Sequence, residues 1–353
     1  MTGDRTAKAG RRSTAQKFRS SRMLGAVLLP FLLTLTSCSA LAPAPAQSSA
    51  GDESPDATAL APLRGTPVPA GSALSPSLAV KIDNHEAARP QVGLERTDIV
   101  FEELVEGGLT RYVAVWQSGI PELVGPVRSI RPMDPDIIAP FGGIVAYSGG
   151  QQQFVDLMEA TDVVTVSQES DETGVFYRED SRDAPHNVIL KAKELVDRND
   201  TVAVPAQQFS YTPTVAGSSA ATDGEAVSAV DSRFSDQRWP GWTWDQASLT
   251  YLRSQEGTPD LDGSGAQLRA TNVLILRVDI DETSTNVPKT TMVGSGEAWV
   301  SAGGKSLHAT WSKTDRDAPI RLVDDNGQAV RLAAGNTWIE LVPGDRGSVE
   351  LRQ

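Results

Sequence analysis

The chain is poor in cysteine and histidine. It has one cysteine, Cys38, among 353 residues, so no disulfide can form within it and each domain must depend on its own core. The three histidines, His85, His186 and His308, form neither an HExxH run nor a Cys/His zinc spacing. No Gly-x-Ser-x-Gly elbow precedes a helix. The sequence therefore disfavours a serine hydrolase of that type and predicts no metal site.

Long hydrophobic runs are also missing. The apolar stretch 23–35 is too short to cross a bilayer, for which about 20 residues are needed, and no later segment is long and apolar enough. It follows a basic stretch and ends at Leu35-Thr36-Ser37-Cys38, as is typical of a secretory signal peptide. Leu-Thr-Ser-Cys also resembles the lipobox of bacterial lipoproteins, in which the cysteine is lipidated and becomes the first mature residue. We expect a signal peptide over residues 1–37 and a lipid anchor on Cys38; the alternative is an incidental thiol beside an ordinary cleavage site.

A lipid on Cys38 would fix the protein to the outer face of the cell membrane. Each buried methylene contributes about 0.8 kcal/mol, and two acyl chains such as palmitate hold a protein stably where one does not. Residues 38–75 are rich in Ala, Pro, Ser and Gly and cannot bury a core, so they predict a flexible linker. The predicted location is the extracytoplasmic face of the cell membrane, with the membrane as a partner through Cys38.

Basic residues are scarce beyond the signal peptide. Residues 1–37 hold seven basic residues and one acidic residue, which leaves 25 basic and 44 acidic residues and a net charge of −19 from Cys38 onward. Such a balance argues against nonspecific nucleic-acid binding, which relies on basic patches. It also argues against charge-driven adhesion to anionic lipids. The expected partners are instead a cell-wall component or an envelope protein, and no nucleic acid.

The pattern of strands and helices divides the remaining chain in two. Residues 76–207 mix short β-branched runs with helical patterns at 152–160 and 190–198, which predicts an N-terminal α/β sandwich domain. Residues 208–353 are rich in Thr, Ser and Gly, with alternating apolar positions between glycine-containing turns, which predicts a smaller, mainly-β C-terminal domain. The predicted fold class is α+β.

Unusual runs of polar and small residues recur in order along both halves. In the first half they are Ile82-Asp83-Asn84-His85, Ala88-Arg89-Pro90-Gln91, Glu106-Gly107-Gly108, Gly125-Pro126-Val127-Arg128-Ser129-Ile130-Arg131 and Ala184-Pro185-His186-Asn187. In the second half they are Trp242-Thr243-Trp244-Asp245 and Gly335-Asn336-Thr337-Trp338-Ile339. This order and spacing resembles the YerB-like lipoproteins, a bacterial family defined by a domain of unknown function. The resemblance implies two domains on a membrane-anchored exported protein, and it implies no established reaction.

Four arginines are the most suggestive candidates for a binding site: Arg89, Arg111, Arg128 and Arg131. If their guanidinium groups converge, they would bind a carboxylate, phosphate or pyrophosphate, because the planar fork bonds such anions bidentately. The motifs add Asp83, Asn84, His186 and Asn187 as candidate ligand-binding residues. The alternative is that each arginine pairs with a nearby acid such as Glu102, Glu103 or Glu106.

Other motifs leave a structural and a functional interpretation open. His186 lies among carboxylates and is either a general base or a histidine that fixes a loop. Trp239, Trp242 and Trp244 either stack on sugar rings or pack in the core, and Trp242 and Trp244 share one face of a strand. The run 260–265 could at most make a weak calcium site.

These features support two hypotheses of different classes. The preferred one is a non-catalytic envelope lipoprotein that binds an anionic ligand or a partner, without a cofactor. The alternative is an enzyme acting on phosphorylated cell-envelope glycan intermediates, by analogy with the LytR-CpsA-Psr phosphotransferases, in which arginines hold a pyrophosphate and acids bind magnesium. Asp83 or Asp98 would then be the magnesium ligand. Whether a reaction is catalysed stays open, and no catalytic residue is assigned.

Overall fold

The computed structural model describes residues 58–72, 74–282 and 287–353. The predicted signal peptide, Cys38 and most of the predicted linker lie outside these residues. No helix within the described ranges is long and apolar enough to cross a membrane.

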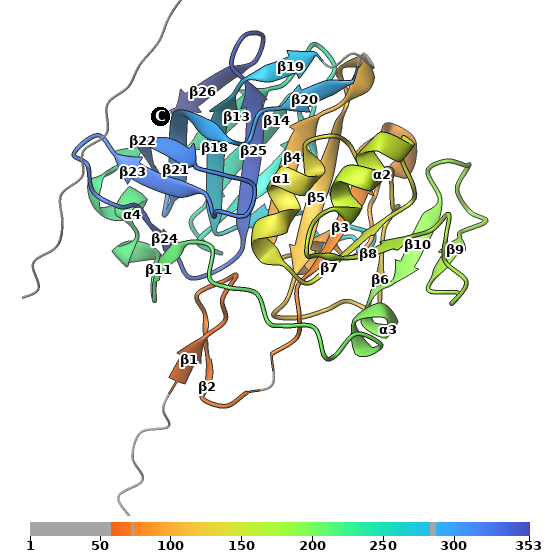
Figure 1. The fold of residues 1–353 in the computed structure, drawn as a ribbon. Helices are drawn as coiled ribbons and strands as arrows, with labels where there is room; N and C mark the ends of the chain where they lie inside the picture. The colour runs from red at the N-terminus through yellow and green to blue at the C-terminus, as the bar shows by residue number, and fades with distance from the viewer. Residues whose placement is uncertain (1–57, 73, 283–286) are drawn as a thin grey trace, which may run out of the picture. The chain divides into compact units, whose positions relative to one another are not determined.

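One large mixed sheet runs through the folded part (Figure 1). In spatial order its strands are β12 (Glu225–Ala226), β22 (Lys305–Lys313), β21 (Gly294–Ala302), β18 (Asn272–Val278), β25 (Thr337–Pro343), β4 (Ile99–Leu104), β5 (Thr110–Trp116), β3 (Leu78–Asp83), β7 (Ile144–Tyr147) and β8 (Val164–Ser167), with β23 (Arg321–Asp324) also paired to β22. The central strands are buried on both faces, which explains their near-continuous apolar sequences.

The two halves of the chain meet within this sheet. β25 pairs in parallel with β4, so that Thr337 lies opposite Ile99 and Leu341 lies opposite Glu103. Strands from residues 76–207 and from residues 208–353 therefore form one continuous sheet, while other strands of each half pair elsewhere. The boundary between residues 207 and 208 stays a prediction.

A second sheet covers one face of the first. It has the order β16 (Thr258–Pro259), β15 (Thr250–Gln255), β14 (Pro240–Asp245), β13 (Ala229–Arg233) and β26 (Ser348–Arg352), with β17 (Arg269–Ala270) paired to β15. Trp242 of this sheet packs edge-to-face on Trp338 of the large sheet, with 5.2 Å between ring centroids. Alternation along β14 and β15 places Trp242 and Tyr251 in the core between the sheets.

Short helices cover part of the opposite face (Figure 1). They are α1 (Asp134–Ile138) and α2 (Gln152–Glu159), and their Ile137, Phe154 and Met158 pack in one core with Phe101 of β4. The remaining helices are α3 (Ala192–Asp197) and α4 (Ser219–Asp223). Smaller sheets are formed by β1 (Thr58–Leu60) with β2 (Pro67–Pro69), by β6 (Leu123–Val124), β10 (Val188–Lys191) and β9 (Phe176–Arg178), by β11 (Ser210–Thr212) with β24 (Arg331–Ala333), and by β19 (Ile280–Glu282) with β20 (Pro288–Thr290).

The fold is mainly β rather than clearly α+β, which corrects the predicted α/β sandwich. The helix expected at 152–160 is present as α2, whereas the helix expected at 190–198 is the shorter α3, preceded by strand β10. Helices of five to eight residues cover only part of one face of the large sheet. The second sheet packs on its other face.

Candidate functional site

Three of the four candidate arginines converge on one pocket. Arg111, Arg128 and Arg131 line a hollow of about 170 Å³ together with Asp83 and His186. His85, Glu106 and Thr110 complete its polar lining.

Neighbouring strands and one anchored loop place these side chains. Asp83 ends β3 and lies directly opposite Arg111 of β5 in the antiparallel pairing. Arg128 and Arg131 lie on the loop after β6, and the Arg128 N–H donates to the Lys81 carbonyl at 2.8 Å. The loop needs Gly125, because a Cβ there would lie 2.8 Å from the Val188 carbonyl oxygen and φ is +156°.

Charge in the pocket is only partly compensated. Arg128 Nε lies 3.0 Å from Asp83 Oδ2, and Arg131 Nε lies 2.8 Å from Glu106 Oε2. Arg111 has no carboxylate partner among the residues that the structure describes, and its Nη1 donates to the Ser129 carbonyl at 2.9 Å. Burial, followed by the charges of Arg131 and Arg128, lowers the pKa of Arg111 to about 10. Three guanidinium groups therefore face two carboxylates.

Two histidines form one wall of this pocket. Their rings stack with centroids 4.3 Å apart and an interplanar angle of 23°. Asp83 orients the His186 ring, because its Oδ2 lies 2.7 Å from His186 Nδ1, and its Oδ1 accepts the backbone N–H of His85 at 3.1 Å. A carboxylate only accepts, so His186 Nδ1 carries the hydrogen of this bond.

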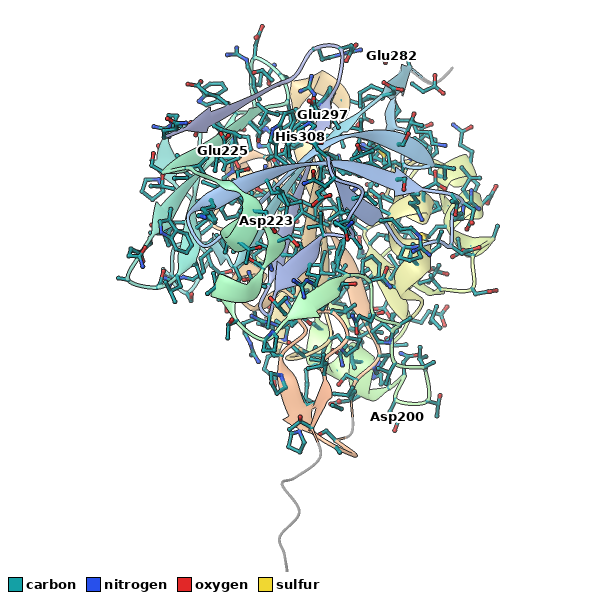
Figure 2. All side chains as sticks on the ribbon, turned by 90° about the vertical axis from the view of Figure 1, so that its left-hand side faces the viewer. Asp200, Asp223, Glu225, Glu282, Glu297 and His308 are labelled. Atoms are coloured by element: carbon teal, nitrogen blue, oxygen red, sulfur yellow. The ribbon has the colours of Figure 1, made fainter. Side chains whose placement is uncertain are left out.

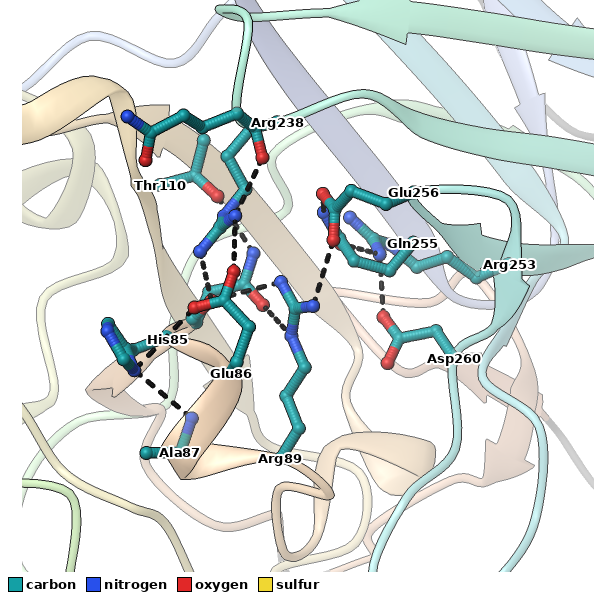
Figure 3. Close-up of polar contacts among 12 residues, drawn as sticks. His85, Glu86, Ala87, Arg89, Thr110, Arg238, Arg253, Gln255, Glu256 and Asp260 are labelled. Carbon is teal, nitrogen blue, oxygen red and sulfur yellow. Dashed lines mark hydrogen bonds and ion pairs between the residues drawn. The ribbon is translucent and has the colours of Figure 1, made fainter.

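Arg89 and Asn84 do not line the pocket. Arg89 Nε donates to Asn84 Oδ1 at 3.0 Å, and Arg89 Nη1 pairs with Glu256 at 2.9 Å (Figure 3). The buried Asn84 amide in turn donates to Thr110 Oγ1 at 2.8 Å. The Arg89–Glu256 pair ties the loop after β3 to the second sheet. Arg89 thus pairs with an acid, which is the alternative to ligand binding given for the four arginines.

Asn187 also lies outside the pocket lining, although it follows His186 directly. Its Oδ1 accepts a hydrogen bond from Arg178 at 2.8 Å, and its Nδ2 donates to the Arg182 carbonyl at 3.2 Å. Asn187 therefore closes the loop that presents His186.

A buried ion network beside the site was not anticipated from the sequence. Arg253 is fully buried, pairs with Glu102 and with Asp260 (2.6 Å), and its guanidinium lies 4.8 Å from the centroid of the Trp338 ring. Burial, together with the nearby charge of Glu102, raises the pKa of Glu340 well above its usual range. Figure 3 shows the contact between Arg253 and Asp260, together with the nearby contacts of Arg89. The signal in the sequence was an arginine between Tyr251 and Gln255 on the inward-facing positions of one strand.

The candidate cation ligands are already engaged within the protein. Asp98 accepts hydrogen bonds from the backbone of Gln117 (2.6 Å) and Ser118 (2.7 Å), and it lies outside the pocket lining. Asp83 is bound by Arg128 and His186, and Asp260 by Arg253. No three His, Cys, Asp or Glu side chains within the described ranges gather as a metal site. The residues present do not fit the magnesium site of the phosphotransferase analogy.

A larger hollow beside β12 and β22 has the opposite charge. His308 lines it with Asp223, Glu225 and Asp325. Figure 2 shows His308, Asp223 and Glu225 on the face turned towards the viewer. His308 Nδ1 lies 2.7 Å from Asp325 Oδ1, and this hydrogen bond raises the pKa of His308. The carboxylates would repel an anion there, so the arginine pocket is the better anion site.

Comparison with known proteins identifies the class to which this architecture belongs. Residues 64–204 match the family described as "Protein of unknown function (DUF3048) N-terminal domain", and residues 230–339 match the corresponding C-terminal domain. The chain belongs to this two-domain, YerB-like family.

One relative and one solved structure, both from Bacillus subtilis, are similar to this chain. The chain is 26% identical over 273 residues to "Putative lipoprotein YerB" of strain 168, covering 75% of this chain and 81% of the relative. It also superimposes on the crystal structure of the YerB protein with a TM-score of 0.72 and 23% identity, over 83% of this chain and 99% of that chain. The structural match shows a shared fold, and the relative's printed name describes a lipoprotein.

Proposed function

We propose that this protein is an extracytoplasmic, lipid-anchored lipoprotein that binds a phosphate or pyrophosphate group in the pocket of Arg111, Arg128 and Arg131. The observation that carries the proposal is the excess of guanidinium over carboxylate in one small pocket of a strongly acidic chain. Arg111 contributes most to this excess, because it is nearly buried and is held by a carbonyl rather than a carboxylate.

An oxyanion fits this environment for electrostatic reasons. Phosphate oxygens accept bidentate hydrogen bonds from guanidinium groups, and these charge-assisted bonds are stronger than neutral ones. Burial and then repulsion from Arg131 and Arg128 lower the pKa of Arg111, and a bound anion would relieve the repulsion. A hollow of about 170 Å³ holds the charged group, while the rest of a larger ligand would extend outside it.

The proposed location is supported by the sequence and by the relative. The basic, apolar and Leu-Thr-Ser-Cys segments follow one another in the order of a lipoprotein signal, and the Bacillus subtilis relative is named a lipoprotein. The bound anion would then belong to a cell-wall component or an envelope partner, since these lie on that side of the membrane.

The test is stabilisation by inorganic phosphate and pyrophosphate. A ligand at 100 times its Kd raises the free energy of unfolding by about 2.7 kcal/mol, which is visible as a rise in Tm. We expect this rise for the unmodified protein and its loss in Arg111→Gln and in the double variant Arg128→Gln, Arg131→Gln. Arg346→Gln is the matched control, because Arg346 forms an exposed ion pair with Glu282. Equal stabilisation of all four proteins would contradict the proposal.

A second candidate function is phosphoryl transfer on a phosphorylated envelope glycan. The observation that favours it is the Asp83–His186 pair, because a carboxylate that fixes the Nδ1–H tautomer leaves Nε2 free to accept a proton beside the arginines. Under this second candidate, incubation with a polyprenyl-pyrophosphate glycan would release or transfer phosphate without added magnesium. His186→Gln would abolish that turnover while phosphate binding persists. If the unmodified protein binds the glycan without turnover, the catalytic candidate is contradicted and the binding proposal stands.

A further inference from the structure

The outer face of the second sheet carries a groove that is unrelated to the arginine pocket. It measures about 430 Å³ and is lined by side chains of β13, β14, β15 and β26, together with Trp239, which precedes β14. Its volume lies in the range of small-molecule sites, which is roughly 300–1,000 Å³. Of the tryptophans in this region, Trp242 is in the core and Trp244 is half-buried, whereas Trp239 is 43% exposed.

The exposed Trp239 ring is held at one end of this groove. The guanidinium of Arg233 lies 6.0 Å from its ring centroid, within the range of a cation–π contact, which orients the ring. The indole Nε1–H has no hydrogen-bond partner among the described residues, so it can donate to a ligand. The indole therefore offers a ligand both a flat apolar face and one N–H donor.

The lining of the groove mixes polar and apolar side chains, the apolar ones including Pro240, Leu252 and Pro259, and it carries no net charge. Its charged residues, Asp231 and Arg352, neutralise each other through contacts of 2.6 Å and 3.3 Å. Thr243 and Ser254 add hydroxyl groups from neighbouring strands. Gly241 adds no side chain to the groove; a Cβ there would lie 2.5 Å from Asp231 Oδ1 and 2.9 Å from Ser254 Oγ, so these side chains would have to shift.

We propose that this groove binds a neutral oligosaccharide, with Trp239 stacked on one pyranose ring. The C–H bonds on the face of a sugar ring carry partial positive charge and pack well on the negative face of an indole. Hydroxyl groups of the sugar match the hydroxyls of the groove and the Asp231–Arg352 pair, which offers both acceptors and donors. The lack of net charge disfavours an anion or a basic peptide.

The test is affinity electrophoresis and calorimetry with a panel of neutral hexose, pentose and N-acetylhexosamine oligosaccharides and with deproteinised cell-wall polysaccharide. At least one glycan is expected to bind, and Trp239→Ala is expected to weaken binding at least tenfold. Trp239→Tyr should retain much of it, because a phenol ring also stacks on a sugar. Tyr177→Ala is the matched control, since Tyr177 is an exposed aromatic residue outside the groove.

Two further results decide the question. Binding that survives in the Arg111→Gln variant would show that the groove acts independently of the arginine pocket. The proposal is overturned if no glycan of the panel binds the unmodified protein, or if Trp239→Ala binds as well as Tyr177→Ala does.

Discussion

Buried cations in this protein differ in how their charge is compensated. Lys81 is fully buried and pairs with Glu103 and with Asp134, and its Nζ lies 2.7 Å from Asp134 Oδ1. Burial lowers the pKa of Lys81 to about 8. Arg253 forms ion pairs with Glu102 and Asp260. Arg111 is nearly as buried, but its guanidinium donates only to the carbonyl oxygen of Ser129. The first two cations complete the fold, whereas the third is available to a ligand.

This contrast predicts opposite effects on stability. Lys81→Met leaves two buried carboxylates without a cation and should lower the free energy of unfolding by about 3–5 kcal/mol. Arg111→Gln removes repulsion from Arg128 and Arg131 and should leave stability unchanged or raised. Urea denaturation measures both. Lys193→Met is the control, because the exposed Lys193–Asp197 pair is worth about 1 kcal/mol or less. A large loss in Arg111→Gln would mean that this arginine serves the fold.

The lipid anchor is a separate prediction at the scale of one residue. Cys38→Ser removes the thiol that would carry the diacylglyceryl group, so the exported protein should leave the membrane fraction. Fractionation and intact-mass measurement of the membrane form test this. An unmodified sulfur in the membrane-bound protein, or no change in the distribution of the variant, would contradict the anchor.

Residue types and spacing located part of the site in advance. Arg111, Arg128, Arg131, Asp83 and His186 were predicted together and line one pocket. Arg89 was grouped with them by residue type alone. Its side chain instead pairs with Glu256, in the C-terminal half of the chain. A partner 167 residues away cannot be inferred from local pattern.

At the scale of elements, the junction of β4 and β25 places two acids in one core. Glu102 of β4 lies opposite Glu340 of β25 in the parallel register. Burial and the nearby charge of Glu102 raise the pKa of Glu340 well above its usual range, and its Oε1 accepts the Trp242 indole N–H at 2.8 Å. Arg253 pairs with Glu102 beside it.

Glu340→Gln should preserve the contact with Trp242, since an amide oxygen also accepts a hydrogen bond from the indole. In the unmodified protein the folded-state pKa exceeds the unfolded value of about 4.3, so stability falls as pH rises from that value towards the folded pKa. The variant should lose this part of the pH dependence and be at least as stable at pH 7. Denaturation at pH 5 and pH 8 measures the slope, with the exposed Glu350→Gln as control. An unchanged slope in Glu340→Gln would show that Glu340 ionises normally.

At the scale of the whole molecule, the two halves share one sheet and one ion network. β4 is buried along its length between β5 and β25, and Glu102 depends on Arg253 from the second half. The sequence predicted a mainly-β second half and the helix α2, because alternation and helical spacing are local signals. It did not predict the shared sheet, because strand order depends on pairings between distant residues such as Thr337 and Ile99.

A fragment of residues 58–207 should therefore not fold alone. It would expose the apolar edge of β4 and leave Glu102 without its cation, and both costs exceed what its short helices offset. Circular dichroism and thermal melting of the fragment, with and without a co-expressed 208–353 fragment, measure this. A cooperative transition in the isolated fragment would show that the first half is autonomous.

The central claim is that three arginines hold a phosphate group. The most direct measurement is a crystal structure of the protein grown with inorganic pyrophosphate. We predict the anion between the guanidinium groups of Arg111, Arg128 and Arg131, within hydrogen-bond distance of each. A pocket that stays free of the anion at saturating pyrophosphate, with these arginines still paired as described, would contradict the claim.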